Sequence, residues 1–187
     1  MTFEKLSALI STLSSGKDYF IIAIDGRCGA GKSTLANKLA CELGCNLIHM
    51  DDFFLPLEKR TPERLSIPGG NTDVERFSDE VMLPLKSGLP FSYRPYDCHK
   101  ASFGEPVKVE PAKITTIEGS YSCHPKLWEC YDLRIFVDID PVTQLERIVA
   151  RNGKDAAKVF EARWIPFEEK YFETFSVKQR CDVVFTC

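Results

Sequence analysis

The feature that most constrains this chain is a glycine-rich loop that follows directly after an apolar run. Residues 19–25 read Tyr-Phe-Ile-Ile-Ala-Ile-Asp, and residues 26–33 then match the pattern G-x-x-x-x-G-K-S. Residues 35–43 form an amphipathic stretch, so the pattern stands between a buried-type strand and a helix. In that setting it predicts a phosphate-binding loop and therefore a nucleoside triphosphate site.

The spacing within the loop has a chemical reason. A polyphosphate needs several backbone N–H groups that converge on it, and glycine lets the chain fold that closely around the oxygens. Lys32 would contact the β- and γ-phosphates, Ser33 would bind Mg²⁺, and the N-terminus of the following helix would attract the anion. The residues that we expect to bind ATP are Gly26, Arg27, Cys28, Gly29, Ala30, Gly31, Lys32, Ser33 and Thr34.

Length and charge limit the classes of function. With 187 residues, the chain is expected to form a single domain over 1–187. No apolar run approaches the ~20 residues that cross a bilayer, and the net charge of −3 argues against a nucleic-acid partner, which requires a basic face. The N-terminus has neither the basic flank nor the apolar core of a targeting segment, so a cytoplasmic location is expected.

The eight cysteines form no C-x-x-C pair, so the sequence predicts neither a zinc framework nor a set of disulfides. Cys28 differs from the others because it lies inside the phosphate loop near the start of a helix, a setting that lowers the pKa of a thiol. Two interpretations follow. Either oxidation of Cys28 interferes with ATP binding, or Cys28 is a loop residue with no role of its own.

Acidic residues stand at the ends of predicted strands. Residues 1–17 predict a covering helix, and a later short strand at 46–50 delivers Asp51 and Asp52 at its carboxyl end. Glu118 likewise ends an apolar stretch. The carboxyl edge is where open α/β sheets bind their ligands, so these acids are candidates for the active site.

Strands alternate with helices along the chain, which predicts a three-layer α/β fold with a central parallel sheet. Residues 55–72 are rich in proline and glycine and predict a loop, after which Asp73 fits the N-cap of a helix over 74–83. Asp140 and Pro141 mark another helix start. Further extended segments are expected at 91–97, 107–109, 112–117, 133–139 and 182–185, and further helical segments at 124–130, from 141, and over 155–175.

Six short sequence blocks, the phosphate loop among them, carry a further signal. They are the loop itself at 24–34, Met-Asp-Asp-Phe-Phe at 50–54, Asn-Thr-Asp at 71–73, Arg-Pro-Tyr-Asp at 94–97, Ile-Glu-Gly-Ser-Tyr at 117–121 and Asp-Ile-Asp-Pro at 138–141. In this order they resemble the uridine kinase (uridine–cytidine kinase) family, which is related to phosphoribulokinase and pantothenate kinase. The resemblance extends from about residue 18 to the C-terminus and implies the nucleoside-kinase type of P-loop fold.

The resemblance also implies roles for residues on the acceptor side. Asp51 matches the family's catalytic base, which orients and deprotonates the acceptor hydroxyl. Asp73 resembles the carboxylate that holds sugar hydroxyls, and Tyr96 the aromatic residue of the nucleoside pocket. His99 matches the pocket histidine, although its spacing from Tyr96 is shorter here than in that family.

On the donor side, Glu118 resembles the family's acidic residue near Mg²⁺. Arg147 and Arg151 resemble the arginines of a lid over about 141–163 that covers the transferring phosphoryl group. The segment after Arg151 is shorter than in the family, so the second lid contact is left open between Lys154 and Arg163.

The residues support this reading on physical grounds. Phosphoryl transfer needs mainly positioning and positive charge around the γ-phosphoryl group, which Lys32, Mg²⁺ and two arginines one turn apart could provide. Asp51 needs only to lie within hydrogen-bond reach of the acceptor hydroxyl. Simpler roles are alternatives for several of these residues. Asp73 can act only as a helix cap, and the two arginines can lie on a solvent-exposed helix face. The aromatic residues of 164–175 can pack in the hydrophobic core.

The sequence therefore predicts a kinase that uses ATP and Mg²⁺ to phosphorylate a small-molecule hydroxyl, with the 5′-hydroxyl of uridine or cytidine favoured. Pantothenate, nicotinamide riboside and sugar phosphates are alternative acceptors. A switch that binds ATP without transferring phosphate is the alternative from another class. No nucleic-acid or membrane partner is expected, and a homo-oligomer is compatible with the sequence.

Overall fold

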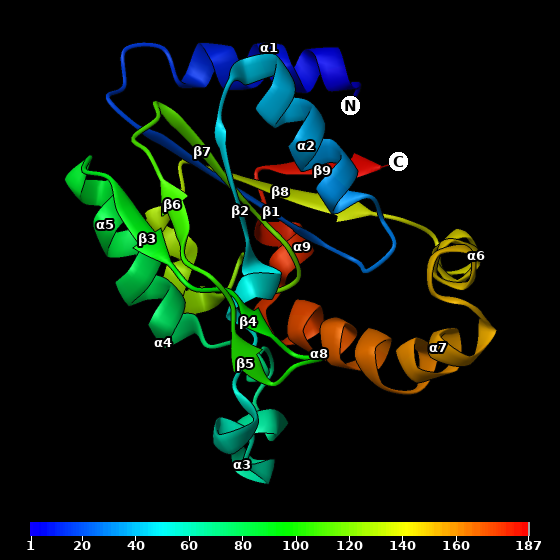
Figure 1. Ribbon diagram of the computed structural model, residues 1–187. Helices are drawn as coiled ribbons and strands as arrows, with labels where there is room; N and C mark the ends of the chain where they lie inside the picture. The colour runs from blue at the N-terminus through cyan, green and yellow to red at the C-terminus, as the bar shows by residue number, and fades with distance from the viewer. Residues whose placement is uncertain (187) are drawn as a thin grey trace.

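The computed structural model describes residues 1–186, which form one central sheet covered by helices (Figure 1). The five strands of this sheet are all parallel and lie in the order β2-β7-β1-β8-β9. Their bounds are β1 Phe20–Gly26, β2 Asn46–His49, β7 Ile114–Glu118, β8 Leu133–Asp138 and β9 Val183–Thr186. The strand that leads into the phosphate loop is therefore central, as a fully buried apolar run predicts.

Side chains of the central strand β1 pack on both faces of the sheet. Phe20, Ile22 and Ile24 pack in one core with α1 (Phe3–Leu13) and α2 (Lys32–Leu43), whereas Ile21 and Ala23 pack in the other. This alternation follows from the two-residue period of a strand. The second face is covered by helices α4 (Val74–Phe77), α8 (Ile165–Phe175) and α9 (Val177–Arg180) and by the 3₁₀ helix η4 (Pro125–Cys130). The predicted three-layer α/β architecture is confirmed.

The segment between β2 and β7 builds a small subregion beside the sheet. Residues 55–72, predicted as a loop, contain two short helical pieces, η2 (Leu57–Lys59) and α3 (Pro62–Ser66). Figure 1 shows α3 projecting from the body. The predicted helix after Asp73 is present as α4, the π-helical η3 (Ser78–Met82) and α5 (Leu83–Ser87) in succession. Two small hairpins follow, β3 (Phe91–Tyr93) with β6 (Val107–Val109) and β4 (Tyr96–Asp97) with β5 (Ser102–Phe103).

A helical arm follows β8. Asp140 caps α6 (Pro141–Asn152) by accepting the N–H groups of Val142 and Thr143, which confirms the predicted helix start. After Gly153 the chain continues through α7 (Lys154–Val159) and the π-helical η5 (Phe160–Trp164) into α8. In Figure 1 this arm bends away from the sheet and then returns to it along α8.

Two further expectations concern membrane-spanning segments and the cysteines. Within residues 1–186, no helix is both long enough and apolar enough to pass through a bilayer. The seven cysteines in this part of the chain are free thiols, and Cys187 lies outside it. The Sγ atoms of Cys123 and Cys181 come within 3.9 Å, which is a thiol contact and not a bond.

Candidate active site

The phosphate loop forms at the carboxyl end of β1, between its two neighbouring strands. Gly26 has a φ of +137° and is so close to β8 that a Cβ there would lie 2.1 Å from the carbonyl oxygen of Val137. Gly31, with a φ of +95°, turns the chain into α2. Because β1 lies between β7 and β8, the loop opens at the carboxyl edge of the sheet, where ligands of open α/β sheets bind.

Lys32 lies across the loop that it belongs to. Its Nζ donates hydrogen bonds to the carbonyl oxygens of Gly26 at 2.7 Å and Arg27 at 3.1 Å, and it lies 3.4 Å from the hydroxyl of Ser120. The residue is 9% exposed. A buried ammonium at this position presents one positive charge to the mouth of the loop, which suits a phosphate. Ala30 packs into the core beneath the loop, while Thr34 lies on the exposed surface of α2.

Ser33 and Glu118 meet at the start of α2. The Ser33 hydroxyl donates to both carboxylate oxygens of Glu118, at 3.2 and 3.3 Å. His49 binds the same carboxylate through Nδ1 at 2.6 Å, and this hydrogen bond is the main reason why the pKa of His49 is raised. A hydroxyl and a carboxylate are the oxygen donors that Mg²⁺ prefers, and Mg²⁺ commonly binds one or two protein groups besides phosphate and water. The residues present therefore fit a Mg²⁺ ion that arrives with a nucleotide.

Asp51 faces the same space from η1 (Met50–Phe53), which follows β2. A Cβ placed on Gly119 would lie 3.2 Å from Oδ1 of Asp51, so this carboxylate stands directly beside the end of β7. Its side chain can be reached by solvent, yet the surrounding protein raises its pKa, Glu118 adds to the rise and Lys32 opposes it. Asp52 turns elsewhere, because it accepts the Tyr93 hydroxyl at 3.0 Å. Of the two acids, Asp51 is the one that shares a space with the loop.

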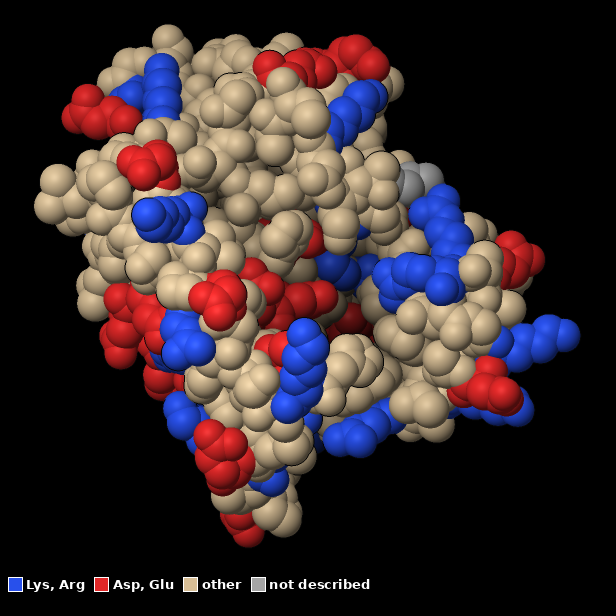
Figure 2. Space-filling model, viewed as in Figure 1, with Lys and Arg blue, Asp and Glu red and all other residues tan. Residues whose placement is uncertain are grey.

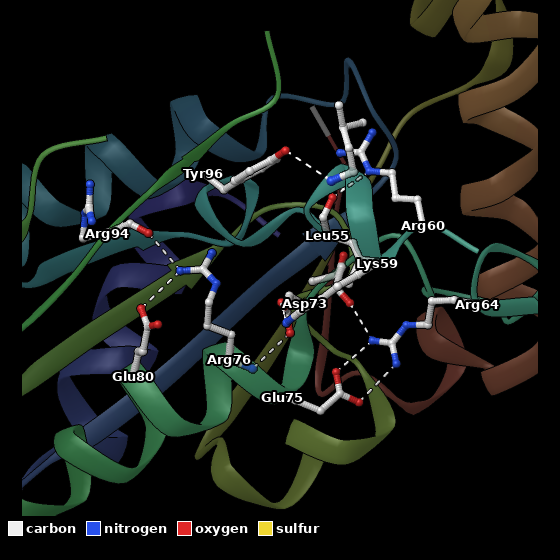
Figure 3. A network of polar contacts seen from close by, with 12 residues as sticks. Leu55, Lys59, Arg60, Arg64, Asp73, Glu75, Arg76, Glu80, Arg94 and Tyr96 are labelled. Carbon is white, nitrogen blue, oxygen red and sulfur yellow. Dashed lines mark hydrogen bonds and ion pairs between the residues drawn. The ribbon is translucent and has the colours of Figure 1, made fainter. Parts of the chain in front are cut away.

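A polar hollow of about 300 Å³ marks the candidate acceptor side, and its lining is largely charged. Asp73 caps α4 through the N–H of Arg76 at 3.2 Å and pairs with Lys59 at 2.9 Å. Arg64 binds Glu75 at 2.8 Å (Figure 3) and, by doing so, is the main cause that lowers the pKa of Glu75 to about 2. The predicted cap is confirmed, and Asp73 also lines the hollow. The lining residues are Leu55, Lys59, Arg64, Asp73 and Glu75.

The two other acceptor candidates are placed differently. Tyr96 is 5% exposed, and its hydroxyl accepts the N–H of Leu57 at 3.2 Å, so it braces the segment that carries Lys59 (Figure 3). His99 is exposed on the turn between β4 and β5, where its N–H donates to Asp97 at 2.8 Å. Neither residue is among those that line the hollow.

The two arginines of α6 also differ. Nη1 of Arg147 approaches the carbonyl oxygen of Gly29 to 3.5 Å, so this side chain reaches the phosphate loop. Arg151 instead binds its neighbour Asn152 at 2.7 Å and lies 5.9 Å from the ring of Phe160. Arg163, one candidate for the second lid contact, lies 4.6 Å from the ring of Trp164. Figure 2 shows a separate depression between the body and the helical arm, with acidic side chains inside it and basic ones inside it and along its edge.

The environment of Cys28 differs from the sequence-based prediction. Burial, together with the nearby carboxylate of Glu168, raises the pKa of the Cys28 thiol to about 12, where a lowered pKa was expected. The prediction was wrong because a helix N-terminus lowers a thiol pKa only where solvent or a cation can stabilise the thiolate. Arg27, the preceding loop residue, is committed to ion pairs with Asp138 at 2.9 Å and with Glu169.

Sequence reasoning missed two buried acids that hold the loop. Asp25 is fully buried and accepts four hydrogen bonds, from the N–H groups of Gly26, Tyr121 and Cys123 and from the hydroxyl of Tyr171. Burial raises its pKa to about 6. Glu168, 5% exposed, is the second. A sequence signal existed for both, namely an acid at the end of an apolar strand and an acid three residues before a buried tyrosine in an aromatic helix.

No known family model matches the chain, but solved structures share its fold. A Bacillus stearothermophilus structure described as a possible uridine kinase is 23% identical, with 97% of each chain covered and a TM-score of 0.68. A Silicibacter protein provisionally described as a fructose transport system kinase is 22% identical, with 99% of each chain covered and a TM-score of 0.78. D-glycerate 3-kinase from Cryptococcus neoformans is 15% identical, with 89% of this chain and 87% of that chain covered and a TM-score of 0.61. At these identities the likeness establishes one point, that this chain has the three-layer α/β fold of uridine-kinase-like P-loop kinases.

Proposed function

We propose that this chain is a phosphotransferase that moves the γ-phosphoryl group of ATP, with Mg²⁺, to a hydroxyl group of a small molecule. One observation carries the proposal: Asp51, Lys32 and the Ser33–Glu118 pair converge at the carboxyl edge of three adjacent strands. A nucleotide-binding switch needs the loop and the metal ligands, but it does not need a carboxylate beside them.

The residues divide the work of phosphoryl transfer. Lys32 and Arg147 supply positive charge to the phosphates, and Ser33 and Glu118 would hold Mg²⁺, which neutralises phosphate charge when it is bound. Asp51 orients the acceptor hydroxyl and takes its proton as the hydroxyl oxygen bonds to the γ-phosphorus and ADP leaves. The raised pKa of Asp51 favours this role, because a more basic carboxylate accepts a proton more readily.

The acceptor that we propose first is the 5′-hydroxyl of uridine or cytidine, which the sequence blocks favour. Asp73 and Lys59 line the polar hollow and are suited to bind sugar hydroxyls. Pantothenate, nicotinamide riboside and sugar phosphates are the other acceptors to test. The proposal includes a cytoplasmic location and a small molecule, not a nucleic acid, as the substrate.

The test is turnover with Mg·ATP on a panel of these acceptors, with Asp51→Asn beside the wild type. Loss of a general base lowers kcat by about 10²- to 10⁴-fold, while the affinity for ATP should persist because Asp51 does not belong to the loop. Asp52→Asn is the matched control, since Asp52 is held by Tyr93, and it should keep most of the activity. Tight ATP binding without turnover on any acceptor would favour the switch instead.

A further inference from the structure

The carboxylate of Glu168 lies at the phosphate loop although the proposed chemistry gives it no task. Oε2 accepts the backbone N–H of Cys28 at 2.9 Å, and Oε1 accepts the hydroxyl of Ser120 at 2.6 Å. The residue is 5% exposed. A buried carboxylate is costly unless it is hydrogen-bonded, and one beside a triphosphate site also faces charge repulsion. Its position therefore needs a compensating role.

The backbone of the same residue, Cys28, is held on its carbonyl side by α6. Gln144, which is 2% exposed, donates from Nε2 to the carbonyl oxygen of Cys28 at 3.0 Å. The next loop residue, Gly29, lies so close to α6 that a Cβ there would come within 3.3 Å of the carbonyl oxygen of Gln144. The backbone N–H and the backbone carbonyl of Cys28, which belong to two successive peptide units, are thus bound by side chains from α8 and α6.

The neighbours of Glu168 on α8 strengthen this attachment. Glu169 pairs with Arg27, and the hydroxyl of Tyr171 donates to Asp25 at 2.9 Å. Three residues within one turn of α8 therefore contact three residues of the segment 25–28. On the other side of the helix, Lys170 donates to the carbonyl oxygen of Ser66 at 3.0 Å, which links α8 to the segment next to the acceptor hollow.

We infer that Glu168 and Gln144 are positioning residues of the nucleotide site, which hold the backbone of Cys28 on both sides and so fix the phosphate loop before ATP binds. A binding site that is ordered in advance loses less free energy on binding, because only the competent fraction of the protein binds ligand at full affinity. The same two contacts hold the arginine-bearing α6 against the loop. This inference rests on the proposed function for its use in catalysis, but not for its test.

The test compares Glu168→Leu, which removes both acceptor oxygens, with Glu168→Gln, which keeps the shape and can still accept from Cys28 and donate to Ser120. The measurement is the Kd of a fluorescent ATP analogue with Mg²⁺, alongside thermal unfolding without nucleotide. Glu168→Leu should raise Kd at least tenfold, since loss of a hydrogen bond to a charged group is worth about tenfold or more. Glu168→Gln should stay within about threefold of the wild type. Glu173→Gln, on the exposed face of the same helix, is the matched control and should change nothing.

A second variant keeps the inference testable if Glu168→Leu does not fold. Gln144→Leu removes the donor to the Cys28 carbonyl and should also raise Kd. The double variant Glu168→Leu/Gln144→Leu should show less than the product of the two effects, because both side chains hold the backbone of the same residue. A folded Glu168→Leu with wild-type affinity would overturn the inference. So would tighter binding in both Glu168 variants, which would mean that the carboxylate opposes the nucleotide. Because the readout is nucleotide affinity, absence of turnover would remove the proposed function and leave this test intact.

Discussion

Replacement of Gly26 by alanine should destabilise the protein strongly, because the new methyl group would collide with backbone. Its Cβ would lie 2.1 Å from the oxygen, 2.7 Å from the nitrogen and 2.8 Å from the carbonyl carbon of Val137. None of these atoms belongs to a flexible side chain, and both residues lie in paired strands at the centre of the sheet. Relief therefore requires β1 and β8 to move apart where the phosphate loop begins.

The size of the effect follows from two contributions. Overpacking of a filled site costs about 1–3 kcal/mol, and a residue with a Cβ at positive φ costs about 1–2 kcal/mol more. The sum, about 2–5 kcal/mol, is a large share of the roughly 5–15 kcal/mol that holds a domain folded. For a chain of this length it corresponds to a loss of about 4–20 °C in Tm.

Gly44→Ala separates the two contributions. Gly44 ends α2 with a φ of +62°, and a Cβ there would meet nothing within 4 Å. It should therefore lose only the conformational part, about 1–2 kcal/mol, or about 2–8 °C. Thermal and urea unfolding of both variants and the wild type would measure the difference. Equal Tm values for Gly26→Ala and Gly44→Ala would refute the argument from the contact with Val137.

Two further predictions use other contacts of the site. Gly119→Ala would place a Cβ 3.0 Å from that of Met50 and 3.2 Å from Oδ1 of Asp51, so it should displace the proposed base and lower kcat by about tenfold to a hundredfold; an unchanged kcat at unchanged ATP affinity would contradict the placement of Asp51. For Asp25, burial raises the pKa from 3.8 to about 6, so the folded state holds the proton more tightly than the unfolded state. The stability that this proton contributes is complete below about pH 4 and is lost as the pH rises through 6, a change of about 3 kcal/mol. Urea unfolding across that range should show this slope in the wild type and a flatter one in Asp25→Asn; parallel slopes would argue against the raised pKa.

The parts of the structure that could be predicted are those encoded by neighbours in sequence. The strand, loop and helix over 20–43 follow from an apolar run, glycine spacing and an amphipathic period, and the caps at Asp73 and Asp140 follow from local hydrogen bonding. The metal candidates Ser33 and Glu118 could be paired because Glu118 ends β7 and Ser33 follows the loop at the carboxyl end of β1, and these two strands are adjacent in the parallel sheet.

The parts that could not be predicted depend on contacts between distant segments. Glu168 reaches Cys28 across 140 positions, and Tyr171 reaches Asp25 across 146. The helical period of α8 indicates that these positions face inward. It does not indicate whether they contact the phosphate loop or pack in the hydrophobic core. The predicted lowering of the Cys28 pKa was wrong for the same reason. Burial in the folded chain raises this pKa most, and the carboxylate of Glu168, distant in sequence, adds to the rise.

The charge of the site explains why the clamp on Cys28 matters for transfer as well as for binding. Glu118 and Glu168 both lie close enough to Asp51 to raise its pKa, so the space for the γ-phosphoryl group is already acidic. A triphosphate adds several negative charges there, and like charges in a partly desolvated site repel one another. Lys32 offsets part of this from the loop, and Arg147 adds charge from α6 only while α6 stays close to Gly29. By holding α6 and α8 to the backbone of one residue, Cys28, the inferred contacts of Gln144 and Glu168 keep that arginine where the nucleotide's charge requires it.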